Sequence, residues 1–138
     1  MKGFRKDRAL IVERRALAAP AAQAPMLLRD LPAPPAASSV FFNAGRGGRT
    51  RSERYRAWRS AAGWQARLQN PRRVRGPVAI SITVEEGSRA DLDNLAKAPI
   101  DLLCELNLIE GDHRDVIREV NLRWSASPGL SIEVRPAT

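Results

Sequence analysis

Apolar and polar residues alternate with a period of two along several short segments of the chain, which predicts β-strands. The sequence MLLRDL (26–31) predicts a first strand that the following prolines end. The sequence PVAISITVEE (77–86) predicts a strand with one apolar side, formed by Val78, Ile80, Ile82 and Val84. VIREVNLRW and LSIEV also alternate, and the SASPG between them is typical of a hairpin turn. The pattern therefore predicts four strands.

Two further segments have the spacing of amphipathic helices. In the first, SERYRAWRSAAGWQARL (52–68), the expected inward stripe consists of Tyr55, Trp58, Ala62 and Leu68. Trp58 and Trp64 could stack on nucleic-acid bases, but a place in the core is the favoured interpretation. The second helix, DLDNLAKAPIDLLCEL, begins at Asp91 as its cap, and Pro99 should kink or open it.

The order of these elements is β-α-β-α-β-β, which predicts an α+β fold with a mixed four-stranded sheet and two helices. Residues 26–138 should form a single domain. Residues 1–25 form a basic leader rich in Ala and Pro, expected to be disordered or partly helical, with a short helix at about residues 7–17. The Gly- and Arg-rich stretch SSVFFNAGRGGRT before the first helix predicts a mobile hairpin or flap.

Two features that the sequence lacks limit the classes of function that fit it. No apolar run approaches the roughly eighteen residues needed to cross a bilayer, so no membrane role is expected. The single cysteine, Cys104, can build neither a disulfide framework nor a cysteine zinc site, which favours a reducing cytoplasm.

Positive charge is concentrated in one segment. The chain has a formal net charge of +8, and Arg46 to Arg75 contains ten arginines and one acid, Glu53. Guanidinium groups bind phosphate oxygens in pairs and stack on bases, so this segment favours a nucleic acid over a merely solvated helix face. The candidate DNA-binding residues are Arg46, Arg49, Arg51, Arg54, Arg56, Arg59 and Arg89.

Three aspartates are candidate metal ligands: Asp91, Asp93 and Asp112. Clustered carboxylates repel one another unless a cation lies among them, and hard oxygen ligands favour Mg²⁺ or Mn²⁺ over zinc. Lys97 lies four residues from both Asp93 and Asp101, where it could neutralise charge on a phosphate. Taken alone, these residues also fit a helix cap, an exposed ion-pair ladder and a turn residue.

The run DLDNLAKAPIDLL (91–103), followed by NLIEGDHRDV, resembles the RusA family of Holliday-junction resolvases, which are small homodimeric endodeoxyribonucleases common in phages and prophages. The D-L-D-N-x-x-K core is specific, and the resemblance extends over roughly residues 26–135. It implies an Mg²⁺-dependent enzyme, with Mn²⁺ as a substitute, that resolves four-way junctions by paired phosphodiester hydrolysis in DNA recombination and repair. Two symmetric cuts fit a twofold homodimer.

The resemblance also implies roles for individual residues. Asp91, Asp93 and Asp112 match the metal-binding acids of the family, and Lys97 matches its catalytic lysine. Asp101 matches a further recurrent acid, and Glu110 is a candidate substitute ligand because Gly111 stands where family members often carry a second acid.

Two other interpretations account for part of the pattern. A non-catalytic DNA-binding protein would use the Arg46–Arg75 segment and keep the aspartates for structure. Its DNA binding would be sensitive to salt and insensitive to metal. A basic RNA-binding or ribosome-associated protein would prefer RNA over branched DNA, and would leave the acids without a role.

Overall fold

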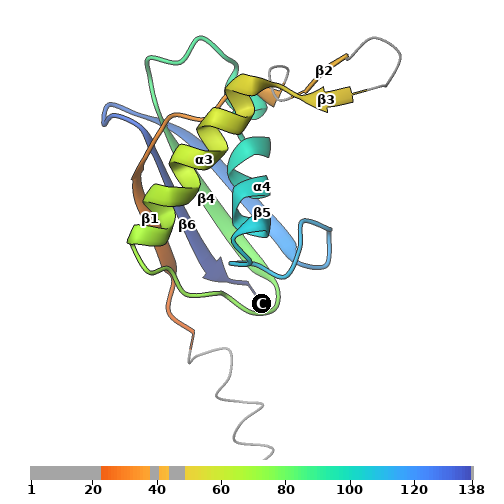
Figure 1. Cartoon of the computed structure of the whole chain (residues 1–138). Coiled ribbons are helices and arrows are strands. Elements are labelled where there is room, and N and C mark those ends of the chain that lie inside the picture. Colours follow the sequence, from red (N-terminus) through yellow and green to blue (C-terminus); the bar gives the residue numbers. More distant parts are fainter. Residues whose placement is uncertain (1–22, 38–40, 44–48, 138) are drawn as a thin grey trace, which may run out of the picture.

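The computed structural model describes residues 23–37, 41–43 and 49–137, with the side chains of 41–43 and 49–51 left aside. Residues 1–22 of the leader, with its expected short helix, lie outside these residues. Along the described chain the elements are β1 (Met26–Leu31), β2 (Phe41–Asn43), β3 (Arg49–Arg51), α3 (Glu53–Leu68), β4 (Val78–Glu85), the 3₁₀ helix η2 (Leu92–Leu95), α4 (Lys97–Glu105), β5 (Ile117–Ser125) and β6 (Leu130–Pro136) (Figure 1).

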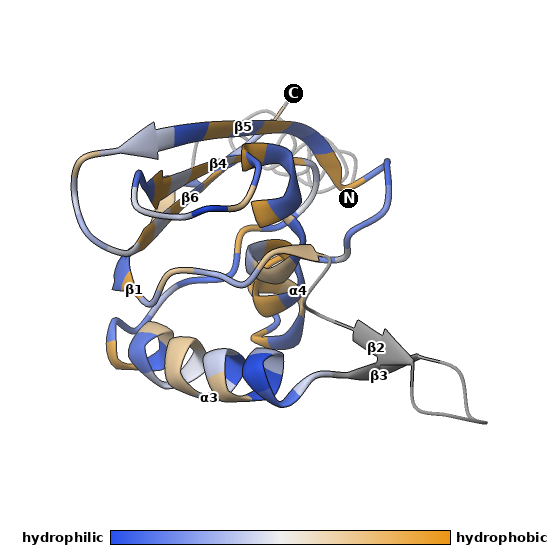
Figure 2. Ribbon diagram, turned by 90° about the horizontal axis from the view of Figure 1, so that it is seen from above, coloured by the Kyte–Doolittle hydropathy of each residue, from blue (hydrophilic) through white to orange (hydrophobic). Residues whose placement is uncertain are grey.

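Within the described residues, four strands form one mixed sheet in the order β1-β6-β4-β5. β6 is antiparallel to both β1 and β4, whereas β5 is parallel to β4. Both α-helices lie on the same face of this sheet (Figure 2). The expected α+β fold, with its mixed four-stranded sheet, two helices and β-α-β-α-β-β order, is confirmed. β2 and β3 pair as a separate antiparallel hairpin, as the sequence predicted for this stretch.

The core lies between the sheet and the helices, and β4 forms its centre. Val78, Ile80, Ile82 and Val84 are all 0% exposed, as the period of two predicted. β6 adds Leu130, Ile132 and Val134 to the same layer. Because β4 has a neighbouring strand on each side, its backbone is paired along both edges.

The predicted hairpin between the last two strands is wrong. β5 and β6 are consecutive in sequence, but β4 lies between them in the sheet. The connection crosses the end of β4, where the Glu85 N–H donates to the Gly129 carbonyl at 3.0 Å and the Glu86 N–H donates to the Ser125 carbonyl at 2.9 Å. The apolar β4 gains two neighbours in this way, which outweighs the local preference of a short Pro-Gly connection for a hairpin.

The inward face of α3 is also partly different from the prediction. Tyr55, Trp58 and Ala62 are buried, but the stripe continues to Ala66, and Leu68 is 61% exposed. Trp64, expected in the core, is 62% exposed. The inward residues recur at intervals of three or four, whereas Trp64 and Leu68 each lie two residues beyond a buried alanine, about 200° around the helix.

Side-chain hydrogen bonds hold the irregular segments against the core. The Trp58 indole N–H donates to the Pro32 carbonyl at 2.9 Å, which fixes the proline-rich loop beside α3. The Gln23 side-chain amide donates to the Arg75 carbonyl at 3.1 Å and accepts from the Arg75 N–H at 2.7 Å. The first contact ties the proline-rich loop to α3, and the other two tie the segment before β1 to the segment before β4.

Candidate active site

The first two candidate aspartates follow the carboxyl end of β4. Asp91 is the N-terminal cap residue of η2, with extended backbone angles, and its carbonyl accepts from the Asn94 N–H at 3.0 Å. Its side chain makes no capping hydrogen bond, and both Asp91 and Asp93 are exposed. The interpretation of Asp91 as a helix cap therefore fails for its carboxylate, which remains available to a ligand.

The predicted continuous helix from Asp91 is divided in two. A 3₁₀ turn precedes α4, which begins at Lys97 and so places Pro99 in its first turn. The first N–H groups of a helix have no intrahelical acceptor, so a proline is tolerated there and not further along. Asp93 consequently lies in η2, outside the α-helix that carries Lys97 and Asp101, and not on one continuous α-helix with them as predicted.

Lys97 and Asp101 do come together on α4. The Lys97 ammonium lies 3.4 Å from an Asp101 carboxylate oxygen, with side-chain exposures of 46% and 16%. An ion pair this exposed stabilises the fold by about 0.3–0.5 kcal/mol at most. The pair therefore matters more for holding the lysine in place than for the stability of the fold.

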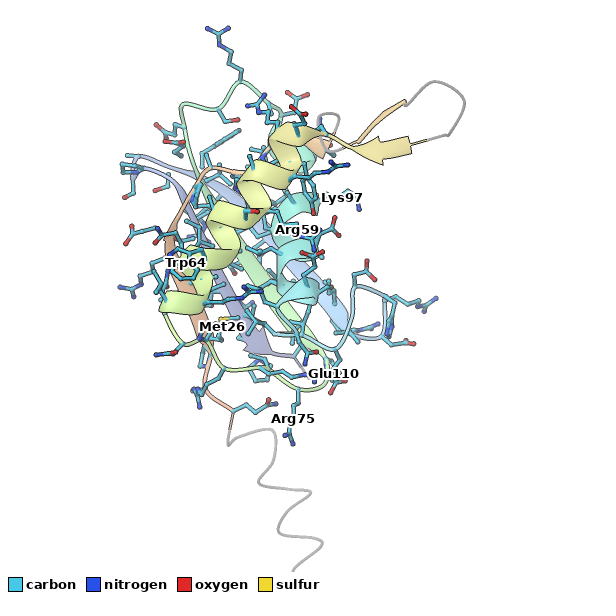
Figure 3. All side chains as sticks on the ribbon, viewed as in Figure 1. Met26, Arg59, Trp64, Arg75, Lys97 and Glu110 are labelled. Carbon is cyan, nitrogen blue, oxygen red and sulfur yellow. The ribbon has the colours of Figure 1, made fainter. Side chains whose placement is uncertain are left out.

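Asp112 lies beyond the other end of α4. Burial raises the pKa of the Cys104 thiol above its ordinary value, and the carboxylates of Asp112 and Asp101 raise it further. This effect places Asp112 within electrostatic range of the last turn of α4. Figure 3 shows Glu110, from the same loop, at the opposite end of α4 from Lys97.

The described residues contain no group of three or more His, Cys, Asp or Glu side chains placed to hold one metal ion. The carboxylates of Asp91, Asp93 and Asp112 are suitable donors for Mg²⁺, but one chain places Asp112 apart from the other two. α4 is nine residues long, about 13 Å at 1.5 Å per residue, and it separates them. A site that uses all three carboxylates therefore requires a second chain, or movement of the loop after α4.

The candidate arginines form two groups on the surface. A hollow of about 650 Å³ next to Asp91 contains Arg54 and Arg89, together with residues of the proline-rich loop and of the turn after β4: Ala33, Pro34, Ala36, Glu85, Gly87, Ser88 and Ala90. Arg54 and Arg89 thus line the same hollow as Ala90, the residue before Asp91.

A second depression, of about 460 Å³, lies between α3 and α4. Its lining residues are Arg56, Arg59, Ser60, Gly63, Trp64, Arg67, Leu102, Glu105 and Leu106. Arg59 forms an ion pair with Glu105 across it. Figure 3 shows Arg59 and Lys97 on the same side of the molecule. Among the other candidates, Arg46 lies outside the described residues, and Arg49 and Arg51 are on β3.

Trp64, expected in the core, belongs to this surface instead. An indole ring that is 62% exposed beside arginines can stack on a base. The signal was present in the spacing, since Trp64 is six residues after Trp58 and so cannot share its face of the helix.

Exposed carboxylates thus follow the end of β4, next to a hollow lined by arginines, and positive charge of this kind favours a phosphate-containing polymer. The family model described as Endodeoxyribonuclease RusA matches residues 32–135, and the chain belongs to this family. Membership implies Holliday-junction resolvase activity, and resolvases of this family generally depend on a divalent metal. A search of curated proteins gave no match. No helix in the described ranges has the length and apolar character needed to span a membrane.

Proposed function

We propose that the protein is an Mg²⁺-dependent endonuclease that resolves four-way DNA junctions by paired cuts, with Mn²⁺ as a substitute metal. The observation that carries the proposal is the family match across residues 32–135, which contain the Asp91–Asp93 pair and its flanking arginines. We further propose that it acts in the cytoplasm as a homodimer and derives from a phage or prophage. Two equivalent active sites suit the two symmetric strands of a junction.

In this proposal Asp91 and Asp93 would hold the metal together with Asp112, brought to them by a second chain or by movement of the loop after α4; the bound metal would activate a water and polarise the phosphate. Arg54 and Arg89 bind the DNA backbone beside Asp91, because guanidinium groups pair with phosphate oxygens. Asp101 and Glu110 are the candidate additional acids. The remaining arginines, Arg46, Arg49, Arg51, Arg56 and Arg59, bring the DNA to this surface.

Lys97 has a distinct role in the proposal. Its ammonium group is 46% exposed and can approach a phosphate, where it offsets the negative charge that develops during attack on phosphorus. Asp101 is a positioning residue, since its carboxylate lies 3.4 Å from that ammonium group. Replacement of Lys97 should lower the cleavage rate more than it lowers the affinity for DNA.

The direct test is cleavage of a synthetic four-way junction with Mg²⁺ by the wild type and by Asp93→Asn. We expect the variant to cleave at least about a hundredfold more slowly, while it still binds the junction. Glu86→Gln is the matched control, since Glu86 is an exposed acid in the loop just before Asp91. Its cleavage should stay close to that of the wild type.

Two outcomes would contradict the proposal. Equal cleavage by the wild type and Asp93→Asn would remove Asp93 from the metal site. No cleavage by the wild type over a range of pH and metals would leave the non-catalytic DNA-binding interpretation. In that case Asp93→Asn should bind DNA more tightly, because it removes repulsion from the phosphates.

A further inference from the structure

The outer edge of β5 is open in the described part of the chain, where β5 pairs with β4 alone. β5 is nine residues long and forms one border of the sheet (Figure 2). Two of its large apolar side chains are exposed, Val120 by 38% and Trp124 by 36%. Proteins usually cover, shorten or bend a long edge strand that carries apolar side chains, because such an edge pairs readily with another strand. The exposed edge therefore indicates a partner strand.

The hydrogen bonds to β4 establish which backbone groups face outward. The Ser125 carbonyl accepts from the Glu86 N–H and so points toward the side of β4. The register with β4 is continuous from Glu119 to Ser125, and successive residues of a strand direct their N–H and C=O groups to opposite sides. The groups of Val120, Leu122 and Trp124 consequently point away from β4, toward the open edge.

β5 is self-complementary around Asn121. When a second β5 runs antiparallel with Asn121 on the twofold axis, Glu119 lies opposite Arg123 of the partner subunit, and Val120 lies opposite Leu122 of the partner subunit. Glu119 and Arg123 share the sheet face away from the helices, whereas Val120 and Leu122 share the helix side. Opposite charges and apolar side chains are both favourable cross-strand pairs, and twofold symmetry makes each pair occur twice.

Other registers lose this match. The outward backbone groups allow a twofold axis at any residue of β5, and the three most central choices are Val120, Asn121 and Leu122. An axis at Val120 puts Glu119 opposite Asn121, and an axis at Leu122 puts Asn121 opposite Arg123. Among the three, the axis at Asn121 alone places acids opposite bases.

We propose that β5 pairs with β5 of a second copy of this chain, antiparallel and with Asn121 on the axis, so that the two sheets become one. The pairing rests on the homodimer of the proposed function and assigns that homodimer to a surface. It also explains the exposure of Val120 and Trp124, since apolar edge residues gain a neighbouring strand.

Charge reversal tests the pairing by sedimentation equilibrium of the full chain without DNA. Glu119→Arg and Arg123→Glu should each raise the dimer dissociation constant about tenfold or more, because each puts like charges opposite one another twice. The double variant restores opposite charges and should recover most of the affinity. Glu119 also pairs with Arg135 at 2.9 Å, so Glu133→Arg is the control, since Glu133 lies 3.6 Å from the same guanidinium group but on β6.

A disulfide tests the register. In a Cys104→Ser background, Asn121→Cys should give a disulfide-linked dimer, because non-hydrogen-bonded antiparallel partners have Cα atoms about 4.5 Å apart, within disulfide reach. Leu122→Cys should cross-link less, and Glu133→Cys should not cross-link.

Three results would overturn the proposal: a wild type that stays monomeric at tens of micromolar, single charge reversals that leave the dimer intact, or absence of the Asn121→Cys cross-link. These readouts involve neither DNA nor metal. A failure of junction cleavage with a normal cross-link would therefore count against the proposed function and not against the interface.

Discussion

Gly129 joins the β5–β6 connection to the sheet, and its replacement by alanine tests the observed strand order. Its φ angle is +81°, in the left-handed region, and a Cβ atom would lie 2.5 Å from the Leu31 carbonyl oxygen. That oxygen belongs to the backbone of β1, so it cannot rotate away as a side chain would. Gly76 provides the matched control, because its φ is +74° and a Cβ atom there would have nothing within 4 Å.

The two substitutions separate conformational strain from steric overlap. Left-handed backbone angles cost a residue with a side chain about 1–2 kcal/mol, and this cost applies equally at Gly76 and Gly129. Overpacking adds about 1–3 kcal/mol, and it applies at Gly129 alone. We therefore expect Gly76→Ala to lower the free energy of unfolding by about 1–2 kcal/mol and Gly129→Ala to lower it by about 2–5 kcal/mol.

Urea unfolding followed by tryptophan fluorescence, at one protein concentration, measures both values by linear extrapolation. The difference between the variants is the informative quantity, because changes in the unfolded chain are nearly the same for two Gly→Ala substitutions. Equal destabilisation would refute the reasoning: it would mean that Gly129 does not approach β1 as closely as the β1-β6-β4-β5 order requires.

Two further predictions concern the site. Asp112→Asn should move the pH profile of Cys104 alkylation to lower pH, because loss of the negative charge stabilises the thiolate and so lowers the raised pKa of the thiol. The control, Asp115→Asn, should leave the profile where it is, and an unchanged profile for Asp112→Asn would place Asp112 away from α4. Trp64→Ala should weaken binding to single-stranded DNA about fivefold or more, whereas Leu68→Ala on the same exposed side of α3 should not; identical binding by both variants would exclude base stacking.

Local patterns were enough to predict most of the elements of this fold. The predicted bounds of the first strand, 26–31, are those observed, because an apolar alternation and the following prolines act on neighbouring residues. The partner of each strand could not be predicted in the same way. The turn before Leu130 has hairpin chemistry, but the position of β6 depends on β4, more than forty residues earlier in the chain. Strand pairing is a property of the assembled sheet and not of a turn.

The candidate site was predictable in its residue types and less so in its geometry. Spacing predicted a helix that would carry Asp93 and Lys97 on one face, but Pro99 moves the start of α4 to Lys97. Spacing also says nothing of the distance between Asp112 and the Asp91–Asp93 pair, which depends on the length of α4. Exposure of Trp64 followed from its angle on the helix, whereas the depression beside it follows from the packing of α4 against α3.

The central position of β6 has a consequence for how the protein folds. β6 is the last of the described strands in sequence, yet in the sheet it lies between β1 and β4 and pairs with both. A sheet that depends on contacts so distant in sequence forms slowly, because the entropy cost of ordering long loops comes before the stabilisation from strand pairing. Until β6 arrives, one edge of the apolar β4 stays open to other chains, so newly made molecules are vulnerable to aggregation at that stage. The aspartates and arginines of the site are all synthesised before β6, so the sheet that positions them is completed only after they are in place in the chain.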